Sequence, residues 1–487
     1  MTIKLFLATV AALVVTGTPA AASERQPTAI PEKCIFTVPG TKLECGQLDV
    51  KLDRSDPQST ARQKLSYVIL KSKSKQPAAD PVVFLTGGPG SSALYFLNVL
   101  AKSAILNTRD LIAIEQRGNG YSEPNLLCDV ADASDIASVR VAYRKCFEQV
   151  AARKLPLRAY NLDEAARDIN DLRTALKIRE WNIFGTSYGS FWALRYLAMR
   201  PAGVRSVILD SPYPPQADPR DSWVAHLNGL DAVFAACAAE TKCNAAYPDL
   251  RNQFLGLLAE AAKQPGYTDD LGSQLINFVI NTNFETASVM NVPRLLYAYA
   301  RKDQNAIQAI ALLDPYGKPK GFDIRRAAST GLKMNAKCIE DTPFQSLQKD
   351  RLVLRGTWPA GVIAAAKLTA SDAVGYCGKI WEVAPGSPDF NQPVTSNVPA
   401  LITVGALDPE TPPANGEAMK QTLPNATLAI LPDSAHAAIA RPSACTIGIL
   451  ERFLARPADK VDIACLAKDQ PRFVLPSDPI AMIRIGR

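Results

Sequence analysis

One serine in this sequence lies in a setting that would suit nucleophilic chemistry. Ser187 is the centre of the pattern G-x-S-x-G at residues 185–189. The apolar run Trp181–Phe184 before it is typical of a buried strand, and a helical pattern begins near Ser190. A sharp turn from strand to helix exposes the serine hydroxyl at the amino end of the helix. We therefore interpret Ser187 as a candidate nucleophile.

A serine nucleophile needs a base, usually histidine, and the chain has only two histidines. His226 lies in the predicted helix Trp223–Ala239, where a single histidine usually packs or faces solvent. His436 lies in a loop after the apolar run Ala426–Leu431, and open α/β sheets place their site groups in such loops. We assign His436 as the base.

The acid that orients the imidazole is expected between the serine and the histidine in chain order. Asp408 follows the predicted strand Leu401–Val404 and precedes His436. Glu410 and Asp433 are competing acids, but Glu410 lies further into the turn and Asp433 directly precedes the histidine loop. Asp408 is our assignment.

Acyl transfer also requires hydrogen-bond donors directed at the developing oxyanion. The backbone N–H of Tyr188, next to the candidate nucleophile, is one expected donor. The second is expected from the glycine-rich loop at residues 86–90, which follows the predicted strand Val82–Leu85. Gly88 is the better candidate there, because Pro89 has no N–H.

These candidates lie between short apolar runs that alternate with helical patterns, which predicts a mostly parallel sheet covered by helices on both faces. Two earlier segments alternate apolar and polar residues and predict an antiparallel edge. The predicted parallel strands are Val82–Leu85, Leu111–Glu115, Trp181–Phe184, Val204–Leu209, Leu401–Val404 and Ala426–Leu431, and the edge segments are Gly46–Leu52 and Leu65–Lys71.

The alternation stops after residue 215 and resumes near residue 397. We expect residues 23–215 and 397–487 to form the sheet domain, and residues 216–396 to form a helical cap domain inserted into it. The helices predicted within this insertion are Trp223–Ala239, Leu250–Lys263, Ser273–Asn281, Val292–Ala300 and Asn305–Leu313.

The first 22 residues have the three regions of a secretory signal peptide, with the apolar run Leu5–Val15 at their centre. No later segment is apolar for long enough to predict a membrane helix. Ten cysteines in an exported chain favour disulfides, and neighbours in sequence suggest five short loops. The expected pairs are Cys34 with Cys45, Cys128 with Cys146, Cys237 with Cys243, Cys338 with Cys377, and Cys445 with Cys465.

The composition argues against several other classes of protein. The net charge of +7 is spread along the 487 residues, so we expect no nucleic-acid partner and no membrane partner after signal cleavage. With two histidines and no C-x-x-C pair, we expect no metal, and the sequence indicates no cofactor. The expected location is the periplasm or the extracellular space.

The motifs together resemble the α/β-hydrolase serine aminopeptidases, the group of proline iminopeptidases and secreted tripeptidyl aminopeptidases. The resemblance rests on LTGGPGSS, IEQRGNGYSEP, FGTSYGS and VGALDPETPP followed by DSAHAAI, and it extends to KCIEDTPF and CTIGILERFL. It implies an α/β-hydrolase fold, a triad of Ser187, Asp408 and His436, and an oxyanion hole from the glycine-rich loop. It also implies that Glu340 binds the substrate α-amino group.

Two positions depart from the pattern of that family. Glu115 stands where aspartate is common, and Ala435 stands where glycine usually precedes the histidine. We expect the first change to shift geometry by one methylene and the second to narrow the pocket beside His436.

The sequence thus predicts an exported serine exopeptidase that releases one to three residues from the free amino terminus of peptides through an acyl-enzyme. A carboxylic ester hydrolase is the alternative, because the same triad serves both reactions. A binding protein on a retained hydrolase scaffold is disfavoured because Ser187, Asp408 and His436 are all present. Serine at position 187 likewise disfavours hydrolases with an aspartate nucleophile.

Overall fold

The computed structural model describes residues 26–130, 136–217, 221–261, 289–303, 305, 317–347, 352–372, 376–440 and 442–478. The predicted signal peptide, the predicted helix Ser273–Asn281 and all but the first residue of Asn305–Leu313 lie outside these described residues.

A nine-stranded sheet runs through the molecule in the order β1-β2-β3-β5-β4-β6-β7-β8-β9. Strands β1, β2 and β3 pair antiparallel, and β3 also pairs antiparallel with β5. Strands β5, β4, β6, β7, β8 and β9, in this order across the sheet, are parallel to one another. The strands are β1 Thr28–Glu32, β2 Leu43–Lys51, β3 Arg62–Leu70, β4 Val82–Leu85, β5 Leu111–Ile114, β6 Trp181–Thr186, β7 Val204–Asp210, β8 Ala400–Gly405 and β9 Ala426–Leu431.

Every predicted strand is present, with ends that differ by a few residues at most. All four residues of β4 and of β5 are buried, as expected for parallel strands covered on both faces. The antiparallel edge has a further strand, β1, that the sequence reasoning missed. Its burial shows why, because all but one of its residues are exposed and no apolar pattern marks it.

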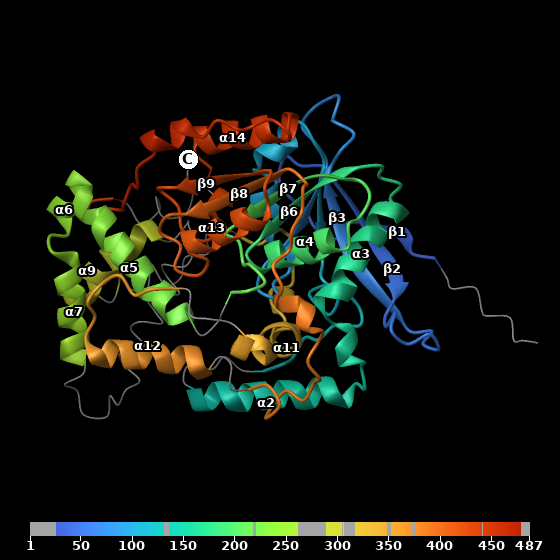
Figure 1. Cartoon of the computed structure of the whole chain (residues 1–487), viewed down its shortest axis with the longest axis horizontal. Helices are drawn as coiled ribbons and strands as arrows, with labels where there is room; N and C mark the ends of the chain where they lie inside the picture. Colours follow the sequence, from blue (N-terminus) through green and yellow to red (C-terminus); the bar gives the residue numbers. More distant parts are fainter. Residues whose placement is uncertain are drawn as a thin grey trace, which may run out of the picture.

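Helices cover the two faces of the sheet and also lie beyond its β9 end (Figure 1). Helices α3 and α4 pack on one face with α13, whereas α1 and α14 pack on the other. The helices on the two faces are α1 Leu97–Leu100, α3 Leu162–Ala175, α4 Tyr188–Ala198, α13 Pro413–Thr422 and α14 Ala444–Ala455, whereas α2 Ile136–Ala152 packs against α11 (Thr330–Ala336) of the segment between β7 and β8.

Between β7 and β8 the described chain contains helices and no strand. Helices α5, α6, α7 and α9 gather at the side of the molecule away from β1 and β2 (Figure 1). The helices of this segment are α5 Ser222–Ala239, α6 Thr241–Ala246, α7 Leu250–Ala261, α9 Val292–Ala300, α11 Thr330–Ala336 and α12 Ala360–Asp372. A short π-helical turn, Lys337–Asp341, continues α11.

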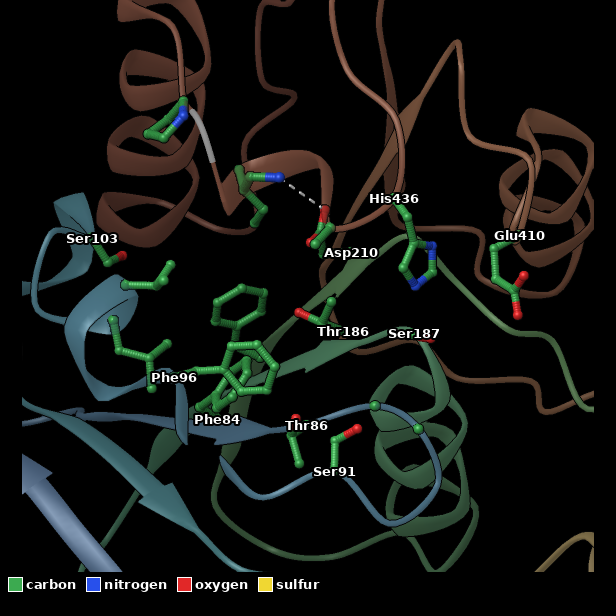
Figure 2. A pocket seen from close by; sticks show the side chains of 18 of the residues that line it. Phe84, Thr86, Ser91, Phe96, Ser103, Thr186, Ser187, Asp210, Glu410 and His436 are labelled. Atoms are coloured by element: carbon green, nitrogen blue, oxygen red, sulfur yellow. Dashed lines mark hydrogen bonds between the residues drawn. The ribbon is translucent and has the colours of Figure 1, made fainter. Parts of the chain in front are cut away.

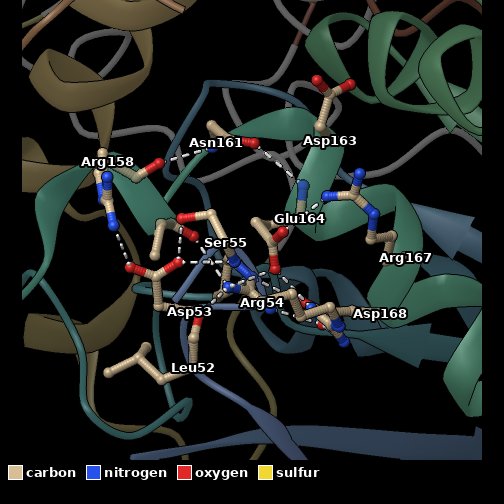
Figure 3. Close-up of polar contacts among 12 residues, drawn as sticks. Leu52, Asp53, Arg54, Ser55, Arg158, Asn161, Asp163, Glu164, Arg167 and Asp168 are labelled. Atoms are coloured by element: carbon tan, nitrogen blue, oxygen red, sulfur yellow. Dashed lines mark hydrogen bonds and ion pairs between the residues drawn. The ribbon is translucent and has the colours of Figure 1, made fainter. Parts of the chain in front are cut away.

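Helix α3 shows how local signals and long-range contacts combine. Asn161 caps it by accepting a hydrogen bond from the Glu164 backbone N–H at 3.0 Å. Arg54 pairs with two buried carboxylates of this helix, Glu164 at 2.7 Å and Asp168 at 2.8 Å (Figure 3). Asp168 also pairs with the fully buried Arg117 at 2.7 Å. These ion pairs therefore attach α3 to the segment that follows β2 and to the turn that follows β5.

All five disulfides join the cysteine pairs predicted from the sequence. Two of them, Cys237–Cys243 and Cys338–Cys377, lie in the helical segment between β7 and β8. Within the part of the chain described here, no helix is both long and apolar enough to cross a membrane.

Candidate active site

Ser187 occupies a strained turn between β6 and α4. Its backbone has φ 57° and ψ −128°, a conformation that residues other than glycine rarely adopt. A side chain at Gly185 would collide with the Gly189 carbonyl, and one at Gly189 would collide with the Leu85 carbonyl. The two glycines of the motif are therefore required by close backbone approach. This is the geometry of a nucleophile elbow.

Asp408 and His436 form a buried pair, with side chains 0% and 4% exposed. The imidazole Nδ1 lies 3.0 Å from Asp408 Oδ2. Asp408 is fixed in turn, because it accepts hydrogen bonds from the backbone N–H groups of Glu410 and Thr411, both at 2.8 Å. A proton on Nδ1 leaves Nε2 as the nitrogen able to act as a base.

A cavity of about 670 Å³ joins these groups. Ser187, His436 and Gly88 all line it, and Figure 2 shows the serine and the histidine on the same side of it, with Glu410 beyond them. Three of the residues selected from the sequence therefore meet in one space, although they come from three distant parts of the chain.

The glycine-rich loop after β4 approaches the nucleophile closely. A side chain at Gly87 would lie 2.7 Å from Ser187 Cβ, so only glycine allows this contact. Gly88 follows with a φ of 114° and lines the cavity. Tyr188 is the first residue of α4, where backbone N–H groups have no partner within the helix. Both expected oxyanion donors thus belong to segments that border Ser187.

Glu340, the residue predicted to bind the substrate α-amino group, lies in the interior of the protein. It is 1% exposed and is not among the residues that line the cavity. Its carboxylate accepts hydrogen bonds from the Leu162 backbone N–H at 2.7 Å and the Tyr188 hydroxyl at 2.6 Å. Burial raises the pKa of Glu340 to about 8, although both hydrogen bonds favour the ionised form. Its contacts connect the helical segment to the nucleophile turn, and none of them faces the cavity.

The carboxylate near the Asp408–His436 pair is Glu410, which the sequence indicated only as a rival acid. Its side chain is 39% exposed and lies 3.0 Å from His226 Nε2. Desolvation acts against ionisation, but the hydrogen bond from His226 and the charges of His226, His436 and Lys337 lower the pKa of Glu410 to about 2. Both Glu410 and His226 line the cavity.

Helices α5 and α11 bring the other charged groups to the cavity. In α5, Gly229 packs against Pro409, which places His226 beside Glu410. In α11, Lys333 lines the cavity because the cap residue Ser329 donates a backbone hydrogen bond to Gly90 at 2.8 Å. Desolvation and the charge of Lys337 lower the pKa of Lys333.

Two further positions clarify the departures from the family pattern. Glu115 is fully buried, contacts Ser92 and has a pKa that burial raises to about 7. It therefore supports the turn after β5 and does not line the cavity. Ala435 is fully buried and is also absent from the cavity lining, so its methyl group does not narrow the pocket as expected.

No group of three or more His, Cys, Asp or Glu side chains within the described ranges is arranged to bind a metal ion. The cavity is lined by hydroxyl groups, two imidazoles, carboxyl groups, ammonium groups and the backbone of the glycine-rich loop.

Comparison with known families agrees with this geometry. Residues 80–266 match the family model described as the alpha/beta hydrolase fold. The chain has the α/β-hydrolase fold. Residues 364–465 of this α/β-hydrolase chain match the model described as TAP-like protein.

Curated relatives carry the names that the sequence motifs suggested. The chain is 25% identical over 305 residues to a tripeptidyl aminopeptidase of Streptomyces coelicolor, and the match covers 56% of each chain. It is 25% identical to a proline iminopeptidase of Arabidopsis thaliana, over 52% of this chain and 55% of the relative. It is 23% identical to the serine protease Hip1 of Mycobacterium tuberculosis, over 77% of this chain and 78% of the relative.

The chain therefore matches little more than half the length of the first two relatives. The resemblance to α/β-hydrolase peptidases predicted from the sequence is confirmed.

Proposed function

We propose that the protein is an exported serine exopeptidase that releases one to three residues from the free amino terminus of peptides. The observation that carries the proposal is the combination of a strained Ser187 turn and a buried Asp408–His436 pair bordering one cavity. Five disulfides and the predicted signal peptide support export.

In the proposed reaction, Ser187 Oγ attacks the scissile carbonyl carbon while His436 Nε2 accepts its proton. Asp408 orients the imidazole and stabilises its charged form. Backbone N–H groups of Gly88 and Tyr188 stabilise the oxyanion. His436 then donates the proton to the leaving amine, and water releases the acyl group by the same route in reverse.

Glu410 is proposed to bind the substrate ammonium group, in place of Glu340. It is an ionised carboxylate in the wall of the cavity that Ser187 also lines. A charge-assisted hydrogen bond to the ammonium would fix the distance from the peptide amino terminus to the nucleophile. His226 Nε2, at 3.0 Å, holds the carboxylate in position.

The test compares tripeptidyl and prolyl chromogenic amides with their amino-blocked forms. Faster cleavage of the free-amine substrates, lost in Ser187→Ala, is the expected result. Preferential cleavage of blocked substrates would contradict the exopeptidase proposal while leaving a serine hydrolase in place.

Carboxylic ester hydrolysis is the second candidate, and one observation favours it. Much of the cavity wall away from the charged residues is apolar, which suits an acyl group better than a peptide amino terminus.

A further inference from the structure

The cavity that Ser187 borders has two chemically different ends. Ser187, His436 and Glu410 lie at one end in Figure 2, whereas Phe84 and Phe96 lie at the other. We call the second end the apolar arm, lined by Phe84, Phe96, Val99, Leu100, Phe184 and Leu450.

We propose that the apolar arm binds the apolar acyl chain of a carboxylic ester or amide whose carbonyl carbon lies at Ser187. This inference rests on Ser187 being the nucleophile, as proposed above. It adds an activity toward acyl substrates with an extended apolar chain, which an enzyme that recognises only peptide amino termini would not need.

The walls of the apolar arm come from parts of the fold that hold their shape. Phe84 belongs to β4 and Phe184 to β6, and their rings meet edge to face with centroids 5.2 Å apart. Phe96 packs on Phe84 at 6.5 Å. Leu100 in α1 and Leu450 in α14 complete the apolar lining. A preformed apolar pocket of this kind binds a chain without having to reorganise.

The passage between the two ends is compatible with an apolar chain. Thr186 and Asp210 lie there, between the aromatic end and the catalytic end (Figure 2). Oδ1 of Asp210 already accepts hydrogen bonds from Thr403 Oγ1 at 2.8 Å and the Ile439 backbone N–H at 3.2 Å. Oδ1 of Asp210 therefore keeps both of its hydrogen-bond partners when a methylene chain passes it.

Burial also reduces the electrostatic cost of this passage. It raises the pKa of Asp210 to about 7, although Thr403 and the charge of His436 act in the opposite direction. Near neutral pH the carboxyl group is therefore partly uncharged, and covering it with hydrocarbon costs less than covering an ionised carboxylate.

The reaction is a balanced ester hydrolysis. The Ser187 oxygen forms a bond to the acyl carbon, the carbon–oxygen bond to the alcohol breaks, and the serine proton passes through His436 to the departing alcohol. Water then cleaves the acyl-enzyme, so the products are the carboxylic acid and the alcohol.

The experiment measures kcat/KM for p-nitrophenyl acetate, butyrate, hexanoate and octanoate. Burying each methylene is expected to raise kcat/KM about threefold to fourfold until the apolar arm is full, so octanoate should exceed acetate by roughly tenfold or more. Equal values for acetate and octanoate would overturn the proposal.

Val99→Phe narrows the apolar arm from the outer part of α1, where Val99 is half-buried. It is expected to lower the ratio of octanoate to acetate kcat/KM by roughly tenfold. Ala104→Leu, at a second position in the cavity wall, replaces it if the first variant does not fold. Val141→Phe adds the same ring on the exposed side of α2, where Val141 is 53% exposed, and should leave the ratio unchanged. Equal loss on both esters in the first two variants would contradict the proposal.

A binding measurement separates this proposal from the catalytic one. Calorimetric titration of the Ser187→Ala protein with octanamide and with acetamide requires no turnover. Tighter binding of octanamide, reduced by Val99→Phe, supports the apolar arm even if no peptide is cleaved. Indistinguishable binding of the two amides would overturn it even if peptide cleavage by the wild-type protein is observed.

Discussion

The carboxyl ends of the parallel strands, here called the sheet edge, and the helical segment between β7 and β8 contribute to the same site in different ways. The sheet edge supplies Ser187, Asp408 and His436, each a few residues beyond the end of a strand. The helical segment supplies His226 and Lys333, which lie within helices. A group that follows a strand is positioned by topology, whereas a group on a helix is positioned by how that helix packs.

Removing the sheet-edge groups should have the largest effect. Ser187→Ala and Asp408→Asn are each expected to lower kcat about 10³-fold or more, because the first removes the nucleophile and the second leaves the imidazole without its orienting charge. Hydrolysis of the most active ester or amide, followed at saturating substrate, measures this.

Asp433→Asn is the matched control, since Asp433 also precedes His436 and accepts a hydrogen bond from Ser434 Oγ at 3.2 Å. A loss in Asp433→Asn as large as that in Asp408→Asn would reverse the assignment of the acid. Full activity of Ser187→Ala would refute the site as a whole.

The contribution of the helical segment can be tested at Glu410, the carboxylate that pairs with His226. Glu410→Gln should raise KM for free-amine peptide amides roughly tenfold, with little change for amino-blocked substrates, because only the former carry the ammonium charge. Steady-state kinetics on paired substrates measures the difference. Glu417→Gln, an exposed position in α13, is the control. An equal rise in KM for both substrate types would argue against ammonium binding.

The proposed pairing of Glu410 with the substrate ammonium group also predicts how KM depends on pH. The pKa of Glu410 is lowered to about 2, so the carboxylate stays ionised throughout the accessible acid range. The substrate α-amino group loses its proton near pH 8. KM for free-amine substrates should therefore rise above about pH 8 and stay flat below it, whereas KM for blocked substrates should show no such rise. A rise in KM on the acid side that is specific to free amines would contradict this.

These contrasts show how much of the molecule was predictable from its sequence. The strands, their order along the chain and the triad candidates followed from apolar runs closed by glycine, proline or aspartate. Glu340 could not be placed in this way, because a carboxylate in a helical segment faces the cavity or the interior according to packing alone. In the structure it reaches Tyr188, which is 152 residues away in the chain.

His226 also could not be placed from the sequence, but in this case helix packing brings the residue to the cavity. A single histidine on a helix carries no sequence signal for a site, yet Gly229 packs on Pro409 and brings His226 to Glu410. The spacing of His226 and Gly229 on one helix was visible, but the partner surface was not.

The contact of Glu340 with Tyr188, which joins the helical segment to α4, can be tested through the pH dependence of the free energy of unfolding. Its pKa rises from 4.5 to about 8 on folding, so between these values the folded protein retains a proton that the unfolded chain releases. Its contribution therefore makes the free energy of unfolding fall as pH rises from about 4.5 to 8. Glu340→Gln, which is always neutral, should lose this part of the decline, by at least about 1 kcal/mol.

Urea unfolding at about pH 5 and pH 8 measures this difference. Glu115 and Asp210 have raised pKa values in both proteins and so cancel in the comparison. Glu417→Gln should keep the wild-type pH dependence. If Glu340→Gln also keeps it, then the carboxyl group is not protonated in the folded protein, and the contact with Tyr188 is that of an ionised carboxylate.

The smallest effect is expected at Ala435, the residue before His436. Ala435→Gly restores the residue usual in the resembling family, but the alanine methyl group is fully buried and does not line the cavity. We expect kcat/KM to change less than about threefold, and the free energy of unfolding to fall by about 0.5–1 kcal/mol because glycine gains more freedom on unfolding. Measuring both quantities on the same preparation separates the two effects. A change in substrate preference without a loss of stability would mean that the His436 loop shapes the cavity from a distance, and the division between sheet edge and helical segment would then be less sharp than their positions indicate.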